Sequence, residues 1–534
     1  NIQDARCIMT TTNTEKYITE VQNCHFINNT IRKYSDTSLV QSGCGSCILS
    51  QNKGQVEVIH CEFTNCLADY CGGAIYAETS SINIFSCRFT LCRTSEYEEY
   101  GYGGAVYLKQ TIEEESNEQF GSNSFFNCSA TTSGGALFIY CVDIHTSNSK
   151  KLTREGDNQE YQIFIAVNNF TDCSSGVEGG AICSGLVDPE SNEIKGDNDL
   201  QVSTCIFTRC ESAKGGALYF QDGTREGDEE TSISACSFYD CYASGEEHEG
   251  YAIHCRSYQI KVDGCSFYDH KRGTRVSTNC IAYIETNEAE VTPTISGLTF
   301  ERNTGVSGLV VKTAKPVTIT MITFNDINDH SPCINLDNWA ITETLTLEEC
   351  VFSNIQDARC IMTTTNTEKY MTVLTKSQFI NNSIRAYSDR SLIHSGCGSC
   401  ILCQNRGNLI VNYCNFTNNM AESNGGAIFA ETNAIALSLC RFVLCIAAQY
   451  EENGHGGAVY LNQTSEGDFE FCSGNIFINC SASYSGGGLF IFCRDVHIKS
   501  RLMRKDDDES EVEGDDNQYQ IIVSSCNFTG CSSG

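Results

Sequence analysis

The sequence predicts an all-β chain folded as a right-handed parallel β-helix of about sixteen coils, with three short strands per coil. Two short motifs that recur along the 534 residues carry this prediction. One is Gly-Gly-small-aliphatic-aromatic, as in residues 72–76, and the other is Cys-x-Phe, as in residues 87–89. A short repeated unit that cannot bury its apolar face alone is typical of a solenoid built by stacking.

Each repeat contains three strand positions. Paired aliphatic residues with the alternation of a strand, such as Val56 and Val58, precede the Cys-x-Phe motif. They are out of phase with the Cys and Phe, so the backbone must turn a corner between two strands. The aliphatic residue of the glycine motif, such as Ile75, marks a third strand with an inward-facing column. The core phenylalanines of successive coils are residues 26, 63, 89, 125, 170, 207, 238, 267, 300, 324, 352, 379, 416, 442, 477 and 528.

Coil length favours the right-handed form. The spacing between core phenylalanines varies from about 24 to about 51 residues, which right-handed β-helices accommodate in their loops and tight left-handed ones tolerate poorly. The long insertions fall mainly after the glycine motif and are acidic, as in residues 222–230 and 505–516. We expect them to be solvated loops at one corner of the helix.

A long duplication overlies the short repeat. Residues 1–17 and 354–370 are identical, and Cys44 aligns with Cys397 further along. We interpret residues 1–353 as a first long repeat of about eleven coils and residues 354–534 as a partial second copy, in one continuous solenoid. At about 4.8 Å per coil, the long repeat spans about 53 Å. Because the sequence stops within a repeat, we expect a window of a longer array that forms a fibre or stalk.

Composition excludes some classes of partner. Lys and Arg number 35 against 67 Asp and Glu, which gives a formal charge of −32 and argues against nucleic acid or an anionic membrane. No apolar run is long enough to span a bilayer, and any targeting segment lies outside this window. We expect the chain to contact itself, end to end or laterally, or to bind host or matrix glycans and proteins.

The 34 cysteines indicate an oxidising compartment, and therefore a secreted or cell-surface protein. They recur in columns, and stacked coils about 4.8 Å apart bring equivalent cysteines within disulfide range, although an unbonded thiol stack has the same sequence pattern. The predicted vertical pairs are Cys66 with Cys92, Cys61 with Cys87, Cys7 with Cys47 and Cys360 with Cys400. Further disulfide candidates in the Phe-x-x-Cys column are Cys128, Cys173, Cys210 and Cys241.

Metal sites are the alternative use of the cysteines and the acidic loops. Cys44 with Cys47, and the run at residues 397–403, have ligand-like spacing for zinc, but no close pair completes four ligands. Residues 196–199 and 514–517 offer oxygen ligands for calcium without the spacing of an EF-hand. We therefore expect no metal site and no cofactor, with calcium at the acidic loops as the weaker alternative.

Phe-x-x-Asn, at residues 26–29, 300–303, 379–382 and 416–419, alternates with Gly-Gly-Ala-aliphatic along the chain. This combination resembles the polymorphic outer membrane protein repeats of chlamydiae and similar repeats in protist surface proteins. The resemblance implies a right-handed β-helix with a structural or adhesive role at the cell surface. Cys replaces Asn in most coils here and no membrane-barrel segment is seen, which favours the protist-like version.

Two sets of outward residues are candidate functional groups. Strand alternation turns the aromatic residue after Ile75 away from the core, which predicts a stripe of rings that is offered to a partner or covered by the acidic-corner loops. The predicted exposed stripe consists of Tyr76, Tyr107, Phe138, Tyr219, Phe429, Tyr460 and Phe490. Candidate glycosylation sequons begin at Asn28, Asn127, Asn169, Asn381, Asn415, Asn462, Asn479 and Asn527.

Catalysis is the competing function. Parallel β-helices that cleave or lyse polysaccharides need paired carboxylates on strands, and the strands here project aromatic residues instead. His455 lies in a Gly-His-Gly segment that resembles one of pectin hydrolases, but the first copy has Tyr102 in its place, so we interpret it as a turn residue. We therefore expect a non-enzymatic, extracellular structural or adhesive solenoid, with a carbohydrate-active or glycan-binding β-helix as the alternative.

Overall fold

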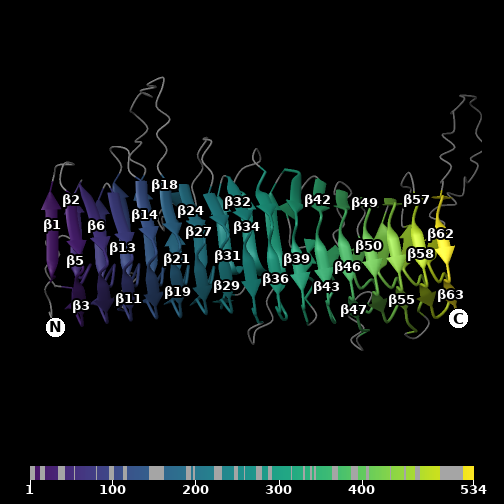
Figure 1. Cartoon of the computed structure of the whole chain (residues 1–534), viewed down its shortest axis with the longest axis horizontal. Coiled ribbons are helices and arrows are strands. Elements are labelled where there is room, and N and C mark those ends of the chain that lie inside the picture. The colour runs from purple at the N-terminus through teal and green to yellow at the C-terminus, as the bar shows by residue number, and fades with distance from the viewer. Residues whose placement is uncertain are drawn as a thin grey trace, which may run out of the picture. The chain divides into compact units, whose positions relative to one another are not determined.

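The computed structural model describes residues 6–12, 18–33, 42–52, 54–79, 81–95, 101–111, 117–142, 162–187, 194–195, 199–221, 231–245, 250–257, 259–271, 280–286, 292–313, 315–328, 331–336, 340–341, 344–363, 371–386, 395–404, 408–432, 434–449, 453–463, 470–493 and 521–534. Every named element of these residues is a β-strand. The chain forms two compact units, residues 1–317 with 338–340, and residues 318–337 with 341–534. Figure 1 labels the strands.

The first unit contains three long parallel sheets. Sheet I carries the glycine motif and consists of β1 (Ile8–Thr12), β5 (Ile48–Asn52), β9 (Ile75–Thr79), β13 (Val106–Thr111), β17 (Leu137–Val142), β21 (Ile182–Ser184), β27 (Leu218–Gln221), β31 (Gly250–Ser257), β34 (Cys280–Thr286) and β37 (Ser307–Thr313). Sheet II carries the paired aliphatic residues and consists of β2 (Ile18–Gln22), β6 (Gln55–Ile59), β10 (Ser81–Phe85), β14 (Asn117–Gly121), β18 (Gln162–Ala166), β24 (Asp199–Ser203), β28 (Thr231–Ser234), β32 (Ile260–Asp263) and β35 (Thr294–Ser296). Sheet III carries the Cys-x-Phe motif and consists of β3 (His25–Ile27), β7 (Glu62–Thr64), β11 (Arg88–Thr90), β15 (Ser124–Phe126), β19 (Asn169–Thr171), β25 (Ile206–Thr208), β29 (Ser237–Tyr239), β33 (Ser266–Tyr268) and β36 (Thr299–Glu301).

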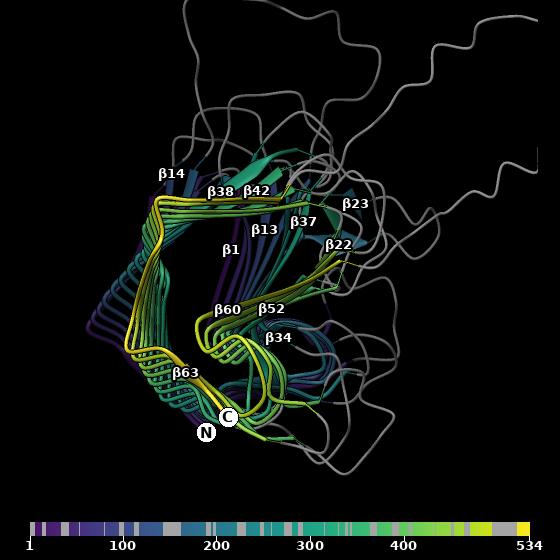
Figure 2. The same ribbon diagram turned by 90° about the vertical axis from the view of Figure 1, so that its right-hand side faces the viewer.

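A fourth sheet of two-residue strands completes most coils of this unit, which the sequence did not predict. It consists of β4 (Thr30–Ile31), β8 (Leu67–Ala68), β12 (Arg93–Thr94), β16 (Ser129–Ala130), β20 (Ser174–Ser175), β26 (Glu211–Ser212) and β30 (Tyr242–Ala243). One antiparallel pair, β22 (Leu186–Val187) with β23 (Ile194–Lys195), lies outside the coils. Figure 2 is viewed along the axis on which the coils stack, and in it β1 of sheet I and β14 of sheet II lie on different sides of the coil outline.

The second unit repeats the pattern. Its part of sheet I consists of β40 (Ile334–Asn335), β44 (Ile361–Thr363), β48 (Ile401–Gln404), β52 (Ile428–Thr432), β56 (Val459–Gln463) and β60 (Leu489–Cys493). Sheet II has β42 (Thr344–Glu348), β45 (Met371–Thr375), β49 (Asn408–Asn412), β53 (Ala434–Ser438), β57 (Glu470–Ser473) and β61 (Ile521–Ser524), and sheet III has β39 (Thr323–Asn325), β43 (Val351–Ser353), β46 (Gln378–Ile380), β50 (Asn415–Thr417), β54 (Arg441–Val443), β58 (Ile476–Ile478) and β62 (Asn527–Thr529). The short strands are β47 (Ser383–Ile384), β51 (Met420–Ala421), β55 (Ile446–Ala447), β59 (Ser481–Ala482) and β63 (Ser532–Ser533). The unit boundaries fall within β38 (Val317–Thr320) and β41 (Ala340–Ile341).

Equivalent residues of successive coils pair in register. Phe63 is the partner of Phe89 in sheet III, and Ile75 is the partner of Val106 in sheet I. The Phe and Ile columns are buried, as the sequence predicted, except that Phe528 is exposed and that Ile8 and Leu489 are half-buried. Counted over both units, 16 strands carry the Cys-x-Phe motif or its equivalent. The predicted fold, a right-handed parallel β-helix of about sixteen coils, is therefore confirmed.

Two sharp corners frame each sheet III strand. Ser86 and Leu91, on either side of β11, both adopt a left-handed φ of 54°. The glycine motif makes a third tight corner, where Gly72 has a φ of 60° and a Cβ on Gly73 would clash with the carbonyl oxygen of Gly104 in the next coil. These corners place the residues that follow Ser86 and Leu91, Cys87 and Cys92, at the same two points of every turn.

Candidate functional site

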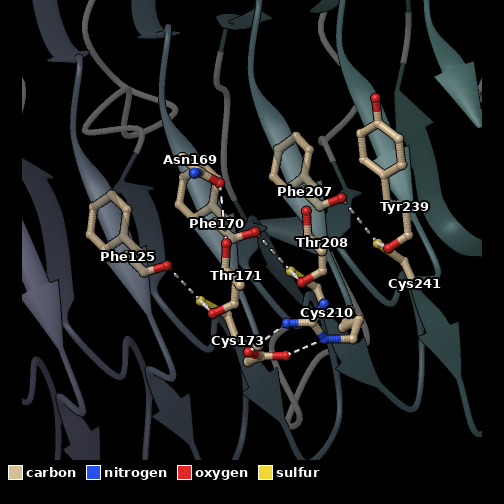
Figure 3. A network of polar contacts seen from close by, with 12 residues as sticks. Phe125, Asn169, Phe170, Thr171, Cys173, Phe207, Thr208, Cys210, Tyr239 and Cys241 are labelled. Carbon is tan, nitrogen blue, oxygen red and sulfur yellow. Dashed lines mark hydrogen bonds and ion pairs between the residues drawn. The ribbon is translucent and has the colours of Figure 1, made fainter.

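Stacked cysteines form a continuous column at the corner after sheet III. Figure 3 shows the Sγ–H groups of Cys173 and Cys210 donating to the carbonyl oxygens of Phe125 and Phe170, one coil earlier, each at 3.7 Å. Each Sγ also lies within 3.7 Å of the carbonyl two residues before it in its own coil. The thiols are therefore weak hydrogen-bond donors that tie each coil to the previous one.

Asparagine performs the same task in other coils. The Asn382 Nδ2 donates to the carbonyl oxygen of Phe352 at 3.1 Å, and its Oδ1 accepts the N–H of Ile355 at 3.0 Å. Asn382 is fully buried, like the cysteines of this column. Both Cys and Asn can occupy this position because the side chain of each can donate to the carbonyl oxygen of the preceding coil. Asn also accepts a hydrogen bond from a backbone N–H.

A second polar column follows the corner before sheet III. There the Asn123 Nδ2 donates to the carbonyl oxygen of Ile84 at 2.8 Å, and its Oδ1 accepts the N–H of Cys87 at 2.9 Å. The thiol of Cys87 donates to the carbonyl oxygen of Val58 at 3.4 Å. At both corners, therefore, a buried side chain donates a hydrogen bond to a backbone carbonyl oxygen one coil away.

The structure brings the cysteines of each predicted vertical pair together. The backbone N–H of Cys61 lies 3.4 Å from the Sγ of Cys87. The strand register makes Cys66 and Cys92, Cys7 and Cys47, and Cys360 and Cys400 neighbours in adjacent coils. The remaining candidates, Cys128, Cys173, Cys210 and Cys241, continue the Cys66 column. The structure contains these residues as thiols, and their oxidation stays a prediction.

Hydrogen bonds with Cys47 and Cys92 lower the pKa of the Cys66 thiol to about 5, but burial has the opposite effect on other thiols of the column. Burial raises the pKa of the Cys92 thiol well above its usual range, and hydrogen bonds with Cys128 and Cys66 raise this pKa further. Burial likewise raises the pKa of Cys128 and of Cys210. A buried protonated thiol is a poor nucleophile and a poor metal ligand, so these positions are suited to packing rather than to chemistry.

Within the described ranges, no group of three or more His, Cys, Asp or Glu residues is arranged to hold a metal ion. Cys44 belongs to an outer cluster with Leu49, Cys71 and Tyr76, whereas Cys47 contacts Cys66, so the two cysteines with zinc-like spacing belong to different clusters. Of the calcium segments, residues 196–198 and 514–517 lie outside the part of the chain that the structure describes.

The aromatic stripe is buried, and the prediction of an exposed surface is wrong. Strand alternation does turn Tyr76 away from Ile75, and the rings of Tyr76 and Tyr107 stack at 5.0 Å. The residues just before the glycine motif, Cys44 and Cys71 with Tyr70 and Tyr102, pack over them and form a second, outer core. Buried rings of the stripe are Tyr76, Phe138, Tyr219 and Phe429, and half-buried ones are Tyr107, Tyr460 and Phe490.

The outer core was missed because, among the described residues, the cover comes from those that precede the glycines, whose packing the sequence analysis did not consider. The sequence did contain a sign of this outer core, because the residue before the glycines is Cys71 in one coil and Tyr102 in the next. In the structure these two residues form a parallel bridge. Apolar or aromatic residues at a tight, otherwise polar corner indicate a contact with a neighbouring column.

Most candidate sequons lie on exposed corners. Asn28, Asn127, Asn381 and Asn479 are exposed and have positive φ, and Asn169, Asn415 and Asn527 are exposed at the start of sheet III strands. Some of these amides form ladders, as where the Asn418 Nδ2 donates to Asn381 Oδ1 at 3.0 Å. Asn462 is half-buried, and its Nδ2 donates to Glu431 at 2.7 Å. Glycosylation of Asn462 would therefore have to break this hydrogen bond, and occupancy stays a prediction at all eight sequons.

His455 lies in a packed turn. Its ring centroid is 4.8 Å from that of Phe490 and 5.6 Å from that of Tyr484. The Oδ1 of Asn424 accepts the backbone N–H groups of both Gly454 and His455. The Gly-His-Gly segment thus has the contacts of a structural corner.

These corners define the repeat that comparison with known proteins detects. Residues 413–431 match the Chlamydia polymorphic membrane protein repeat. The matched segment begins just before β50, includes Phe416 and Asn419, and ends within β52 after the glycine motif. The resemblance to this repeat family is therefore confirmed, and the protist-like version stays a prediction.

The curated proteins contain no match to this chain. Among the residues that the structure describes, no helix has the length and apolar character that crossing a membrane requires.

Proposed function

We propose that the chain is a cell-surface structural repeat protein whose stacked coils form an elongated stalk or fibre with an adhesive role. The observation that carries this proposal is the continuous stacking of the core phenylalanine rings within each unit. In the first unit, the phenylalanine rings from Phe26 to Phe300 stack at centroid distances of 4.7–5.1 Å. In the second unit, the rings from Phe324 to Phe528 stack at 4.6–5.2 Å.

This architecture favours a mechanical role. Each coil contacts only its neighbours, so added coils make a solenoid longer without making its core wider. The formal charge of −32 disfavours collapse of such chains onto one another at low salt. We therefore propose end-to-end or specific lateral self-contacts, and host or matrix glycans or proteins as further partners.

The family match supports the proposed location. The matched repeat is that of a Chlamydia membrane protein, which suggests a protein associated with a surface or an outer membrane. The 34 cysteines support an extracellular position, and exposed sequons such as Asn127 support a glycoprotein.

A non-enzymatic role is supported by the use of the reactive side chains. The thiols of the Cys173 column are buried donors to carbonyl oxygens, and the imidazole of His455 packs against Phe490. The aromatic stripe that was predicted as a glycan-stacking surface is not available for this role, because rings such as Tyr76 and Phe138 are buried. We therefore favour the structural role over the carbohydrate-active alternative.

Surface location is tested on intact cells that express the protein. We expect external protease to remove the chain before permeabilisation, and an antibody to the acidic segment 222–230 to label unpermeabilised cells. A cytosolic protein that stays intact and unlabelled in the same sample is the control. Protection from protease together with labelling only after permeabilisation would contradict the proposal.

A further inference from the structure

Two buried cysteines from different columns meet inside the first unit. The Sγ of Cys47 lies 3.1 Å from the Sγ of Cys66, and neither residue is exposed. This separation is shorter than the sulfur–oxygen contacts of the Phe-x-x-Cys column, which are 3.6–3.8 Å. The Cys66 thiol thus contacts another sulfur more closely than it contacts any carbonyl oxygen to which it donates.

The two cysteines occupy the two ends of a single coil. Cys47 immediately precedes β5 in sheet I, and Cys66 immediately precedes β8 in the short sheet. Between them the chain passes through β5, β6 and β7 and so visits all three long sheets before it returns. A bond between these sulfur atoms would therefore enclose the three long-sheet strands of one coil, β5, β6 and β7, in a covalent ring.

Axial neighbours are less suited to a bond. Equivalent positions in adjacent coils are separated by about 4.8 Å, whereas the Cβ atoms of a disulfide are about 3.5–4.5 Å apart, so an axial bond would have to draw two coils together. The hydrogen bonds of the column show no sign of such pairing, because Cys92 and Cys128 lie 3.6 and 3.7 Å from their carbonyl acceptors one coil earlier. Cys47 and Cys66 belong to the same coil and their sulfur atoms lie 3.1 Å apart, so a bond between them does not have to draw two coils together.

The second copy provides an internal comparison. Cys400 takes the place of Cys47, but Asn419 takes the place of Cys66. Asn419 donates to the carbonyl oxygen of Phe379 at 3.0 Å. Cys400 receives the Asn382 Nδ2 at 3.8 Å, just as Cys47 receives the Asn29 Nδ2 at 3.4 Å. The fold thus accepts Asn at this position, and only the first copy has a cysteine on both sides of the corner.

We propose that Cys47 and Cys66 form a disulfide that covalently closes one coil of the first unit. A low-molecular-weight disulfide in the surrounding medium is the oxidant. The Cys66 thiolate attacks one of its sulfur atoms and expels the first thiolate, and the Cys47 thiolate then attacks Cys66 Sγ and expels the second. Two cysteine thiols lose two protons and two electrons, and one external disulfide becomes two thiols.

The exchange takes place before the coil closes, because both sulfur atoms are buried afterwards. This bond excludes the axial pairs Cys7 with Cys47 and Cys66 with Cys92, and it is compatible with the other predicted pairs. While the disulfide is intact, tension cannot extend the residues between the two cysteines. Such a bond would therefore suit a stalk that bears a mechanical load.

Peptide mapping of the intact protein tests the assignment. The chain is isolated without reductant, denatured in iodoacetamide and digested with trypsin and a Glu-specific protease. We expect residues 34–53 to be linked to residues 63–78. Recovery of both peptides alkylated at every cysteine, or linked instead to peptides that contain Cys7 or Cys92, would overturn the proposal.

Two single substitutions show whether Cys66 or Cys71 forms that link, because residues 63–78 contain both cysteines. Cys66→Asn copies Asn419 and should fold and lose the link. Cys71→Asn copies Asn424 at the equivalent position of the second copy and should keep it. Loss of the link in Cys71→Asn with retention in Cys66→Asn would show that Cys71 forms the link instead of Cys66, and would refute the assignment.

A mechanical measurement gives an independent readout. When single molecules are pulled, reduction should lengthen the fully extended chain by about 65 Å, the span of the 19 peptide units between the two cysteines. The Cys66→Asn chain should lack this increment and the Cys71→Asn chain should show it. The same extended length before and after reduction in the unsubstituted chain would contradict the closed coil.

Discussion

Removal of one stacked ring should weaken the first unit at a defined place. Phe125 is fully buried and its ring stacks on those of Phe89 and Phe170, each at 4.8 Å. Deleting a buried Phe side chain costs about 3–5 kcal/mol through lost transfer energy and the cavity that remains. Loss of stacking on both faces places Phe125→Ala near the upper end, at about 4–5 kcal/mol. Phe126 is the matched control, since it follows Phe125 in β15 but is 45 % exposed.

Native-state hydrogen exchange read by mass spectrometry measures this effect locally. A loss of about 4 kcal/mol corresponds to about a thousand-fold faster exchange of the amides in β11, β15 and β19, provided that they exchange through opening of these coils. Phe126→Ala should change exchange there by less than about threefold. Equal effects of the two substitutions would refute the conclusion that the Phe column is the core on which the coils stack.

Two further predictions concern the polar columns. Asn382→Ala removes a donor to Phe352 and an acceptor for Ile355, so it should lower the free energy of urea unfolding by about 2–4 kcal/mol. Asn382→Cys keeps a donor and should lower this free energy by about half as much. Equal losses in the two variants would contradict the shared role of Cys and Asn. His270 is fully buried in the same column, and burial lowers its pKa to about 4. The unfolded chain therefore takes up this proton more readily, so stability should be complete above about pH 6.5 and fall by about 3 kcal/mol as the pH drops to 4. His270→Asn, which copies Asn303 in the next coil, should lose that part of the pH dependence, and an unchanged profile would show that His270 is not its source.

The sequence predicted the columns well because each depends on one residue type recurring at one point of a turn. Phe89 and Ile75 could be assigned to the core from alternation alone, since a buried strand face requires apolar residues at every second position. The two-residue strands such as β12 were not predictable, because a strand of this length has no periodicity to detect.

Contacts between columns depend on the backbone conformation of the corners, which the periodicity of the sequence does not predict. Tyr76 was correctly placed outside the main core, but its burial depends on Cys71 and Tyr102 folding over sheet I. The approach of Cys47 to Cys66 likewise joins two columns that sequence reasoning treated separately. The role of the cysteines as replacements for Asn could be suspected from Phe-x-x-Cys and Phe-x-x-Asn, but the shared carbonyl acceptor appears only in the structure.

The central claim, that stacking of coils gives the molecule length, is tested most directly by electron cryomicroscopy of two chains. One is residues 1–534, and the other carries a second copy of residues 1–353 inserted before Asn354, where the native junction is preserved because residues 1–17 and 354–370 are identical. We predict rods of equal width, the second longer by about 53 Å, from about eleven coils at about 4.8 Å each. Particles that grow wider instead of longer would contradict the claim.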